Sequence, residues 1–457
     1  MQEPITVDLK TTNRQLFDFV MRTPLWFFNA SGALSLILAV GLGIVVGTLW
    51  VGLQIFGYSH PVYWAFLIVN FVFWIGISHA GVMISAILRL TQAEWRRPVT
   101  RAAEILTVFS LMTAMLHPVI HSGRAWRTLY WAFPYDFMRG MWPNPRSPLV
   151  WDPSAIFTYL TSTILFIYVA LLPDLAMARD RAPDVVRRFA YSVLSMGFRG
   201  TTRQWRIQGV AGILLSALIL PIFVSVHSIV SWDFAVTGVP GWHNTVFAPY
   251  FVIGAVHSGV SAVVTIMIIL RYVFKLQNFI TRDHIDALAR LLIAVATTWF
   301  FFLMLDFMFG LYGTESVEVD TWQRRLFTGA WSTLAIIFIL CAFVIPVPMW
   351  LFRRVRRSFF LMFLTTILVN IGMWIERFML IVPGLERKSN LTFQYSTFTP
   401  TFWEIAIVLS MLALPAIGLL TFAKVFPIMP AADIREGQVV ATTLRIGRAN
   451  VPATMRE

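Results

Sequence analysis

Charged residues and cysteines are both scarce in this chain of 457 residues. Only 13% of the residues are charged, whereas 58% are hydrophobic, and the mean hydropathy is +0.71. Soluble globular domains carry about twice that fraction of charge, so the composition excludes an ordinary soluble globule. The one cysteine, Cys341, cannot form a disulfide within the chain or hold an iron–sulfur cluster. Any such cluster has to belong to a partner.

Patterns for a removable signal peptide and for a resident haem are also missing. No charged segment leads into a short apolar core with a small-residue cleavage site, so we expect no cleavage. His117 and His121 lie four residues apart and share a helix face, but Pro118 interrupts that turn and no third metal ligand follows at a known spacing. No span has histidines two or four turns apart, as bis-histidine haems usually require. We expect no metal and no haem in this chain.

Long apolar stretches, in contrast, occur ten times. A helix needs about 20 apolar residues to cross a bilayer, and none of the stretches shows the short alternating pattern of a membrane β-strand. The expected spans are 32–56, 62–88, 102–121, 154–177, 208–230, 246–270, 286–311, 327–350, 358–382 and 401–424. The sequence therefore predicts an all-α polytopic membrane protein with ten transmembrane helices.

The net charge of +13 is distributed asymmetrically between the loops. One set of loops, together with the termini, holds 26 of the lysines and arginines, and the opposite loops hold 8. The positive-inside rule then places both termini in the cytoplasm. The basic charge is thus a topology signal, and we expect membrane lipid and no nucleic acid as a partner.

A weak internal repeat organises the spans. The second span carries His-Ala-Gly-Val at 79–82 and the sixth carries His-Ser-Gly-Val at 257–260, each followed by an arginine at its inner end. This repeat predicts two four-helix bundles in the same orientation, with the first and tenth spans as flanking helices. The expected segments are 1–31 (cytoplasmic or interfacial), 32–60 (flanking first helix), 61–235 (first bundle, with a long outer loop at 122–153), 236–382 (second bundle), 383–430 (flanking tenth helix) and 431–457 (cytoplasmic tail).

Three segments outside the spans mix aromatic with charged or proline residues. Residues 14–29 and 178–207 alternate arginines with apolar residues, which predicts helices lying on the membrane surface. The outer loop at 122–153 is rich in aromatic residues and proline. It is either an ordered lid or docking surface, or simply an interfacial aromatic belt.

Ionisable residues inside the spans require an explanation, since one charge at the bilayer centre costs on the order of 3 kcal/mol. One hypothesis is a proton-conducting chain, and the other is a set of mutual pairs that hold helices together. The candidates are His79, Glu104, His227, Asp233, His257, Asp306, Glu376 and Arg377.

His121 at the outer end of the third span and Asp152 at the outer start of the fourth suit quinol chemistry. Quinol oxidation releases two protons, and a neutral imidazole and a carboxylate in a dry environment can accept them. A second interpretation is that Asp152 caps the fourth helix, with Pro153 at the first helical position. The two interpretations are compatible.

Several motifs are shared with one group of membrane proteins. They are Ser-His-Ala-Gly at 78–81, Arg-Ala-Ala-Glu at 101–104, His-Ser-Gly-Arg at 121–124, Tyr-Trp-Ala-Phe-Pro-Tyr at 130–135 and Trp-Asp at 151–152, with further matches at 231–235 and 241–251. In these motifs, over roughly residues 16–425, the chain resembles the NrfD/PsrC-type membrane subunits and, more narrowly, the ten-helix quinol-oxidising subunit type (ActC) of alternative complex III.

The resemblance implies two four-helix bundles with flanking helices and a subunit without its own redox centre. It implies that His121 and Asp152 bind and oxidise quinol, either menaquinol or ubiquinol, near the outer leaflet, with Arg124 close by. Electrons would pass to an iron–sulfur subunit and to multihaem and monohaem cytochrome c subunits, beside a homologous NrfD-like subunit. The chain would thus be a subunit of a quinol oxidoreductase in a prokaryotic plasma membrane, with proton translocation as an additional role.

Three alternatives remain at the level of sequence. The chain would otherwise be a quinone-reducing anchor of a polysulfide-reductase-like molybdoenzyme, the homologous proton-handling subunit, or a secondary transporter. The transporter hypothesis is disfavoured, because the two repeats have the same orientation and the sequence has no paired helices broken by Gly or Pro at mid-membrane.

Overall fold

The computed structural model describes residues 16–58, 62–123, 126, 146–386, 398–434, 443–446 and 449–452. Within these residues, ten helical segments are long and apolar enough to cross a membrane, which confirms the predicted fold class. They are α2 (Leu25–Val51), α3 (Ala65–Leu90), α4 (Arg97–His121), α6 (Pro148–Arg179), α8 (Thr202–Ala235), α9 (Phe247–Val273), α10 (Arg282–Tyr312), the segment Ser332–Leu351, α15 (Phe359–Leu385) and the segment Phe402–Val425.

Two of the spans are built from more than one helical piece. The eighth consists of α12 (Ser332–Ile339), the π-helical η6 (Leu340–Val344) and α13 (Pro346–Leu351), and the tenth consists of α16 (Phe402–Met411) and α17 (Ala413–Val425). The shorter elements are η1 (Leu53–Ile55), η2 (Glu94–Arg96), α7 (Val185–Leu194), α11 (Ser316–Gln323), the π-helical η5 (Arg324–Thr328), α14 (Arg353–Arg356) and an antiparallel hairpin of β1 (Thr443–Ile446) and β2 (Ala449–Pro452).

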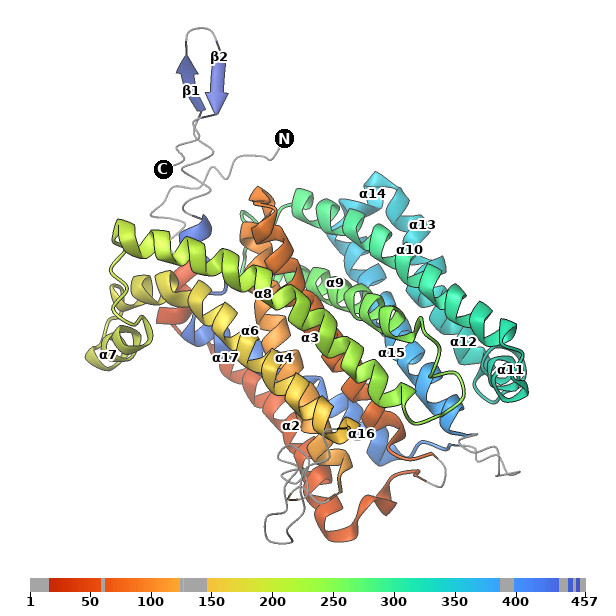
Figure 1. The fold of residues 1–457 in the computed structure, drawn as a ribbon. Helices are drawn as coiled ribbons and strands as arrows, with labels where there is room; N and C mark the ends of the chain where they lie inside the picture. The colour runs from red at the N-terminus through yellow and green to blue at the C-terminus, as the bar shows by residue number, and fades with distance from the viewer. Residues whose placement is uncertain are drawn as a thin grey trace.

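The helices pack side by side, so their ends define two faces of the molecule (Figure 1). At one face, α3 ends, α4 and α10 begin, and α14 lies; we call it the Arg-rich face. The opposite face is the one at which α4 ends at His121 and α6 begins at Pro148. By the positive-inside rule, the Arg-rich face is the predicted cytoplasmic side.

Helices α3 and α9 form the centre of the molecule and carry the two repeated motifs. They meet through small residues spaced four apart, Gly76 and Ala80 on α3 and Ala255 and Gly259 on α9. A Cβ added to Gly259 would lie 2.2 Å from the Cβ of Ala80, and one added to Gly76 would lie 3.6 Å from that of Ala255. Small residues at this spacing let helix backbones approach closely within a membrane.

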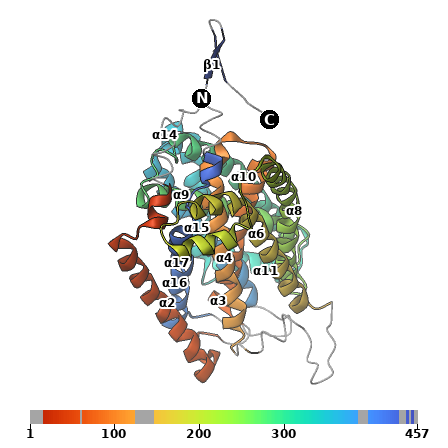
Figure 2. The same ribbon diagram turned by 90° about the vertical axis from the view of Figure 1, so that its left-hand side faces the viewer.

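The first and tenth spans pack together on one side of the bundles (Figure 2). The Glu404 carboxylate at the start of α16 accepts a hydrogen bond from the Gly57 amide at 3.0 Å. A Cβ on Gly41 of α2 would lie 2.0 Å from the Ser410 hydroxyl. The two flanking helices are therefore neighbours, although they are the most distant spans in the sequence.

Of the boundaries that differ from the sequence-based expectation, two change an interpretation. Residues 14–29 do not form one surface helix: a short helix covers 16–21, and α2 starts at Leu25 after a break that includes Pro24. Helix α6 starts at Pro148, so Asp152 lies inside its first turns and the interpretation of Asp152 as a helix cap is wrong. Proline at the true first position explains this earlier start.

The amphipathic segment at 178–207 does contain a surface helix, α7, with exposed Val185, Val186 and Phe189. The predicted lid within the outer loop falls on residues 124–125 and 127–145, outside the described residues.

Replacing Gly259 by Val should destabilise the packing of α3 against α9. The added methyl groups have no space against Ala80, and overpacking of this kind costs about 1–3 kcal/mol. The thermal unfolding midpoint of the purified protein in detergent should therefore fall. Gly43→Val is the control, because nothing lies within 4 Å of a Cβ at that position of α2. Equal midpoints for both variants would show that the central contact is not tight.

Candidate functional site

Two carboxyl groups meet at the opposite face. Asp152 lies in the first turns of α6, Asp233 lies in the last turn of α8, and their carboxyl groups are close enough to interact. Ionised carboxylates only accept hydrogen bonds, so two carboxyl groups can share one only when one of them carries a proton. The Oδ1 atom of each is buried without a hydrogen-bond partner among the described residues. The pair can therefore hold a proton and still receive a further donor.

His121 ends α4 at this same face, where aromatic rings hold its imidazole. The Trp64 ring stacks on it with centroids 5.4 Å apart, and the Phe71 ring approaches edge-on at 6.5 Å. One turn earlier, His117 Nδ1 donates to the Thr113 carbonyl at 2.8 Å, which leaves Nε2 as the acceptor of a neutral ring. Neither His117 Nε2 nor His121 Nδ1 has a partner in the described part of the chain. Both nitrogens are thus available to a hydroxyl-bearing ligand.

Two residues beside the His121 site, Gly123 and Trp64, adopt left-handed backbone conformations. Gly123 adopts φ +69°, and a Cβ there would lie 2.9 Å from the Leu53 side chain, so the glycine after His121-Ser122 has a geometric reason. Trp64 adopts φ 62°, a left-handed conformation that costs a bulky residue on the order of 1 kcal/mol. Sequence reasoning did not single out Trp64. Arg124, the third predicted quinol residue, lies outside the described residues.

A stacked trio occupies the middle of the first bundle. His79 of α3 stacks on Tyr159 of α6 at 4.4 Å and contacts His227 of α8 at 4.9 Å between ring centroids. His79 Nδ1 contacts the Ile75 carbonyl at 2.5 Å, and the Tyr159 hydroxyl donates to the Ser78 carbonyl at 2.9 Å. Two of the predicted proton-path residues are therefore neighbours. Tyr159 was missed, because an uncharged tyrosine in an apolar span gives no signal of its own.

Toward the Arg-rich face, the first bundle buries a charged cluster. Arg101 of α4 binds Asp174 of α6 at 2.8 Å and lies 3.6 Å from Glu104. The Ser85 hydroxyl donates to Glu104 at 2.7 Å, and the Ala432 amide donates to Asp174 at 3.1 Å. Glu104 is therefore a member of a paired cluster that joins three helices to the segment after α17.

Phe251 of α9 links the polar residues of the two bundles. Its ring centroid lies 5.8 Å from that of His227, and the Arg377 guanidinium lies over the same ring at 4.7 Å. Arg377 also lies 3.3 Å from Glu376, which accepts a hydrogen bond from the Tyr250 hydroxyl. The structure therefore brings His227, Glu376 and Arg377 into one region at the centre of the protein.

Arg325 is a buried cation that sequence reasoning had placed in an outer loop. The π-helical turn η5 carries it inward, where it donates to the Leu380 carbonyl at 3.0 Å and lies over the Trp322 ring at 5.0 Å. It lines a cavity of about 180 Å³ together with Tyr250 and Glu376. A π-turn of this kind cannot be read from the sequence pattern.

The two remaining candidates make separate contacts. Asn244 donates to Asp306 at 3.0 Å near the opposite face. His257 Nε2 lies 3.0 Å from the Ala342 carbonyl in η6, and its ring stacks on Trp299 at 5.4 Å. Asp306 and His257 are thus held by local partners.

One carboxyl group just outside the spans has a pKa that its surroundings change. Glu386, at the end of α15, is half-buried, and this burial raises the pKa of its carboxyl above the ordinary value. Hydrogen bonds from Trp331 Nε1 at 2.9 Å and from the Phe398 amide at 3.2 Å oppose that rise.

These observations define a class of protein. Within the described ranges, no group of three or more His, Cys, Asp or Glu residues is placed to hold a metal ion. Ionisable and aromatic side chains instead gather inside two helix bundles and at one face. This is a multi-pass membrane protein with imidazole and carboxyl groups at helix ends on one face.

The particular family follows from comparison with known proteins. The chain belongs to the polysulphide reductase NrfD family, which it matches over residues 54–387. It is similar to a putative membrane subunit of dimethyl sulfoxide reductase from Halobacterium salinarum, with 23% identity over 431 residues that cover 88% of this chain and 91% of the relative. Membrane subunits of this family belong to oxidoreductase complexes and associate with iron–sulfur and molybdoenzyme subunits.

The buried Arg101–Asp174 pair should be far more important for stability than the exposed Arg179–Asp180 pair, although both have N–O distances of 2.8 Å. Asp174→Ala leaves a buried guanidinium short of a partner, which costs about 3–5 kcal/mol. Asp180→Ala removes an exposed pair worth at most about 1 kcal/mol.

Thermal unfolding of both variants in detergent measures this difference. A similar midpoint for Asp174→Ala and for the native protein would contradict the assigned role of the cluster.

Proposed function

We propose that this chain is the quinol-reactive membrane subunit of an oxidoreductase complex, and that it binds quinol at the opposite face. The Asp152–Asp233 carboxyl pair carries the proposal. It lies at helix ends on the same face as His121, in a family of oxidoreductase membrane subunits. A quinol, either menaquinol or ubiquinol, reaches such a site from the lipid.

The reaction converts one quinol to a quinone and releases two electrons and two protons. His121 Nδ1 and an oxygen of the carboxyl pair each lack a protein partner in the described chain, so each can accept a hydroxyl proton. Because the Asp152 and Asp233 carboxyl groups are neighbours, a proton taken up by Asp152 can pass to Asp233 and leave at the membrane surface. The Trp64 ring fixes the imidazole in place.

The electrons leave to a partner subunit. One cysteine cannot ligate a cluster, and we propose an iron–sulfur subunit as the first acceptor. An alternative complex III arrangement of the ActC type would also include multihaem and monohaem cytochrome c subunits and a homologous NrfD-like subunit. In that arrangement, quinol is the reductant and c-type haem receives the electrons.

A second candidate keeps the same site but changes the partner. The relative from Halobacterium salinarum is described as the membrane subunit of a dimethyl sulfoxide reductase. This likeness supports a membrane anchor that exchanges electrons between the quinone pool and a molybdoenzyme, at least as well as it supports the alternative complex III arrangement. The site chemistry is the same in both arrangements, because quinol oxidation and quinone reduction are reverse reactions.

The identity of the partner distinguishes the two candidates. Affinity purification of the full chain from its native membrane should bring down its complex. Absorbance bands of c-type haem in that complex would support the alternative complex III arrangement. Molybdenum found by elemental analysis, without such bands, would support the molybdoenzyme arrangement.

Removing the proton acceptors should abolish quinol turnover in either complex. Asp152→Asn, Asp233→Asn and His121→Phe each remove a group that accepts a proton, and losses of about 10²-fold or more are typical for such groups. The measurement is quinol-dependent reduction of a soluble acceptor by the purified complex. Asp18→Asn, an exposed carboxylate paired with Arg22, is the matched control. Unchanged turnover in all three variants of an intact complex would place the quinol site elsewhere.

A further inference from the structure

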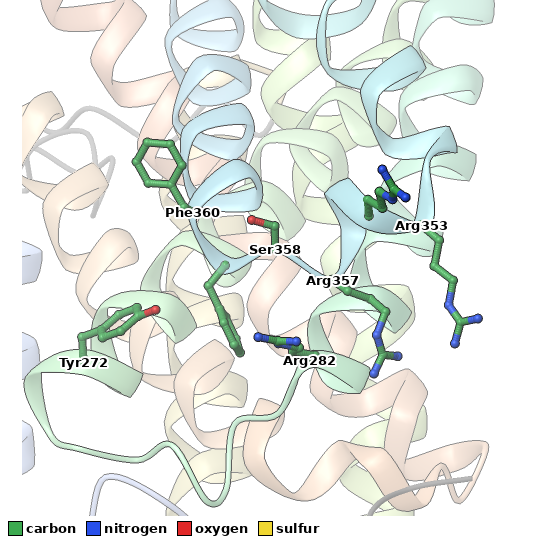
Figure 3. A pocket seen from close by; sticks show the side chains of 8 residues that line it. Tyr272, Arg282, Arg353, Arg357, Ser358 and Phe360 are labelled. Atoms are coloured by element: carbon green, nitrogen blue, oxygen red, sulfur yellow. The ribbon is translucent and has the colours of Figure 1, made fainter.

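A second candidate binding site lies on the Arg-rich face, away from the proposed quinol site. It is a pocket of about 650 Å³ where the ends of α9, α10, α14 and α15 converge (Figure 3). Its lining is Tyr272, Arg282, Arg353, Arg354, Arg357, Ser358, Phe359 and Phe360. The lining contains four arginines and no carboxylate. We propose that this pocket binds the phosphate-bearing headgroup of an anionic lipid.

Nearby carboxylates do not neutralise the pocket, because other arginines already occupy them. Asp283 binds Arg357, and Asp286 receives hydrogen bonds from Arg290 and Arg356, each at 2.7 Å. Both oxygens of the Asp286 carboxylate are engaged in this way, one by each arginine. Neither carboxylate is therefore left to compensate the remaining arginines of the lining.

Three arginines therefore remain uncompensated around the pocket. Arg282, Arg353 and Arg354 have no carboxylate partner within the part of the chain that the structure describes. Arg282 comes from the start of α10, and the other two come from α14, so they approach the pocket from different elements. A phosphate group placed between them would receive charge-assisted hydrogen bonds from each side.

The walls of the pocket are held in place by two further arginines that bond to backbone carbonyls. Arg271 donates to the carbonyls of Gln277 and Ile280, and its guanidinium lies 4.1 Å from the centroid of the Phe359 ring. Arg356 donates to the Trp350 and Leu351 carbonyls at 2.8 and 2.9 Å. The uncompensated arginines therefore extend from a fixed frame.

Apolar surface beside the pocket favours a lipid over a free phosphate ion. Tyr272 and Phe360 line the pocket, and Phe360 is 71% exposed. Leu351 at the end of α13, Phe352 just before α14 and Leu364 on α15 are also exposed. Basic pockets between transmembrane helices on the cytoplasmic side are suited to anionic headgroups, with acyl chains lying along the exposed apolar residues.

The test compares lipid binding by the purified full-length protein and by a triple variant, R282Q/R353Q/R354Q. Native mass spectrometry measures binding of dioleoylphosphatidylglycerol, of zwitterionic dioleoylphosphatidylcholine and of inorganic phosphate. Each arginine near a headgroup contributes roughly 1 kcal/mol, so loss of all three should weaken phosphatidylglycerol binding on the order of 100-fold. The matched control is R199Q/R203Q/R206Q, which makes the same charge change at exposed positions near the start of α8.

Three results would bear on the proposal. Loss of phosphatidylglycerol binding in R282Q/R353Q/R354Q alone, with phosphatidylcholine bound weakly throughout, supports it. Equal losses in both triple variants would show only a general effect of surface charge and would overturn it. Binding of inorganic phosphate that displaces phosphatidylglycerol would assign the pocket to a free anion and would also overturn it. Unfolding midpoints of the variants verify that each remains folded.

Discussion

The cost of placing ionisable groups in a bilayer is the constraint on which this structure depends. A charge left alone at that depth is expensive, whereas a hydrogen-bonded pair is tolerated. Arg101, Glu104 and Asp174 satisfy this requirement by meeting between helices of the first bundle, and Tyr250, Glu376 and Arg377 do so in the second. Each cluster consists of residues from different spans, so the same contacts fix how the spans pack.

Close packing of α3 against α9 joins these clusters. Because Gly76, Ala80, Ala255 and Gly259 are small, the two central helices approach closely. On α9, the Phe251 ring contacts both His227 of α8 and Arg377 of α15. Of the two repeated motifs, Ala80 from the first and Gly259 from the second lie at this contact, whereas Gly81 packs against Ala103 and Thr107 of α4. Aromatic and histidine side chains near the contact of α3 with α9 give the interior a polar centre.

The two faces of the protein differ in which ionisable groups they carry and in how those groups are paired. The opposite face carries two neighbouring carboxyl groups and a histidine held by aromatic rings, which suits the acceptance of protons. At the Arg-rich face, carboxylates are already bound by arginines and the surplus is positive. The first arrangement suits exchange with a neutral lipid-soluble reductant, and the second suits an anionic membrane surface.

The sequence by itself determined the fold class, the ten spans and the family. Apolar length and loop charge report directly on membrane insertion, and these signals are local. The Glu376–Arg377 doublet and His121 were also visible, since a charge in an apolar run stands out. Only the tertiary structure decided that Asp152 meets Asp233, that α2 packs on α16 and that η5 brings Arg325 inside. These outcomes depend on which helices become neighbours and on how each one is rotated, and no single stretch of sequence carries that information.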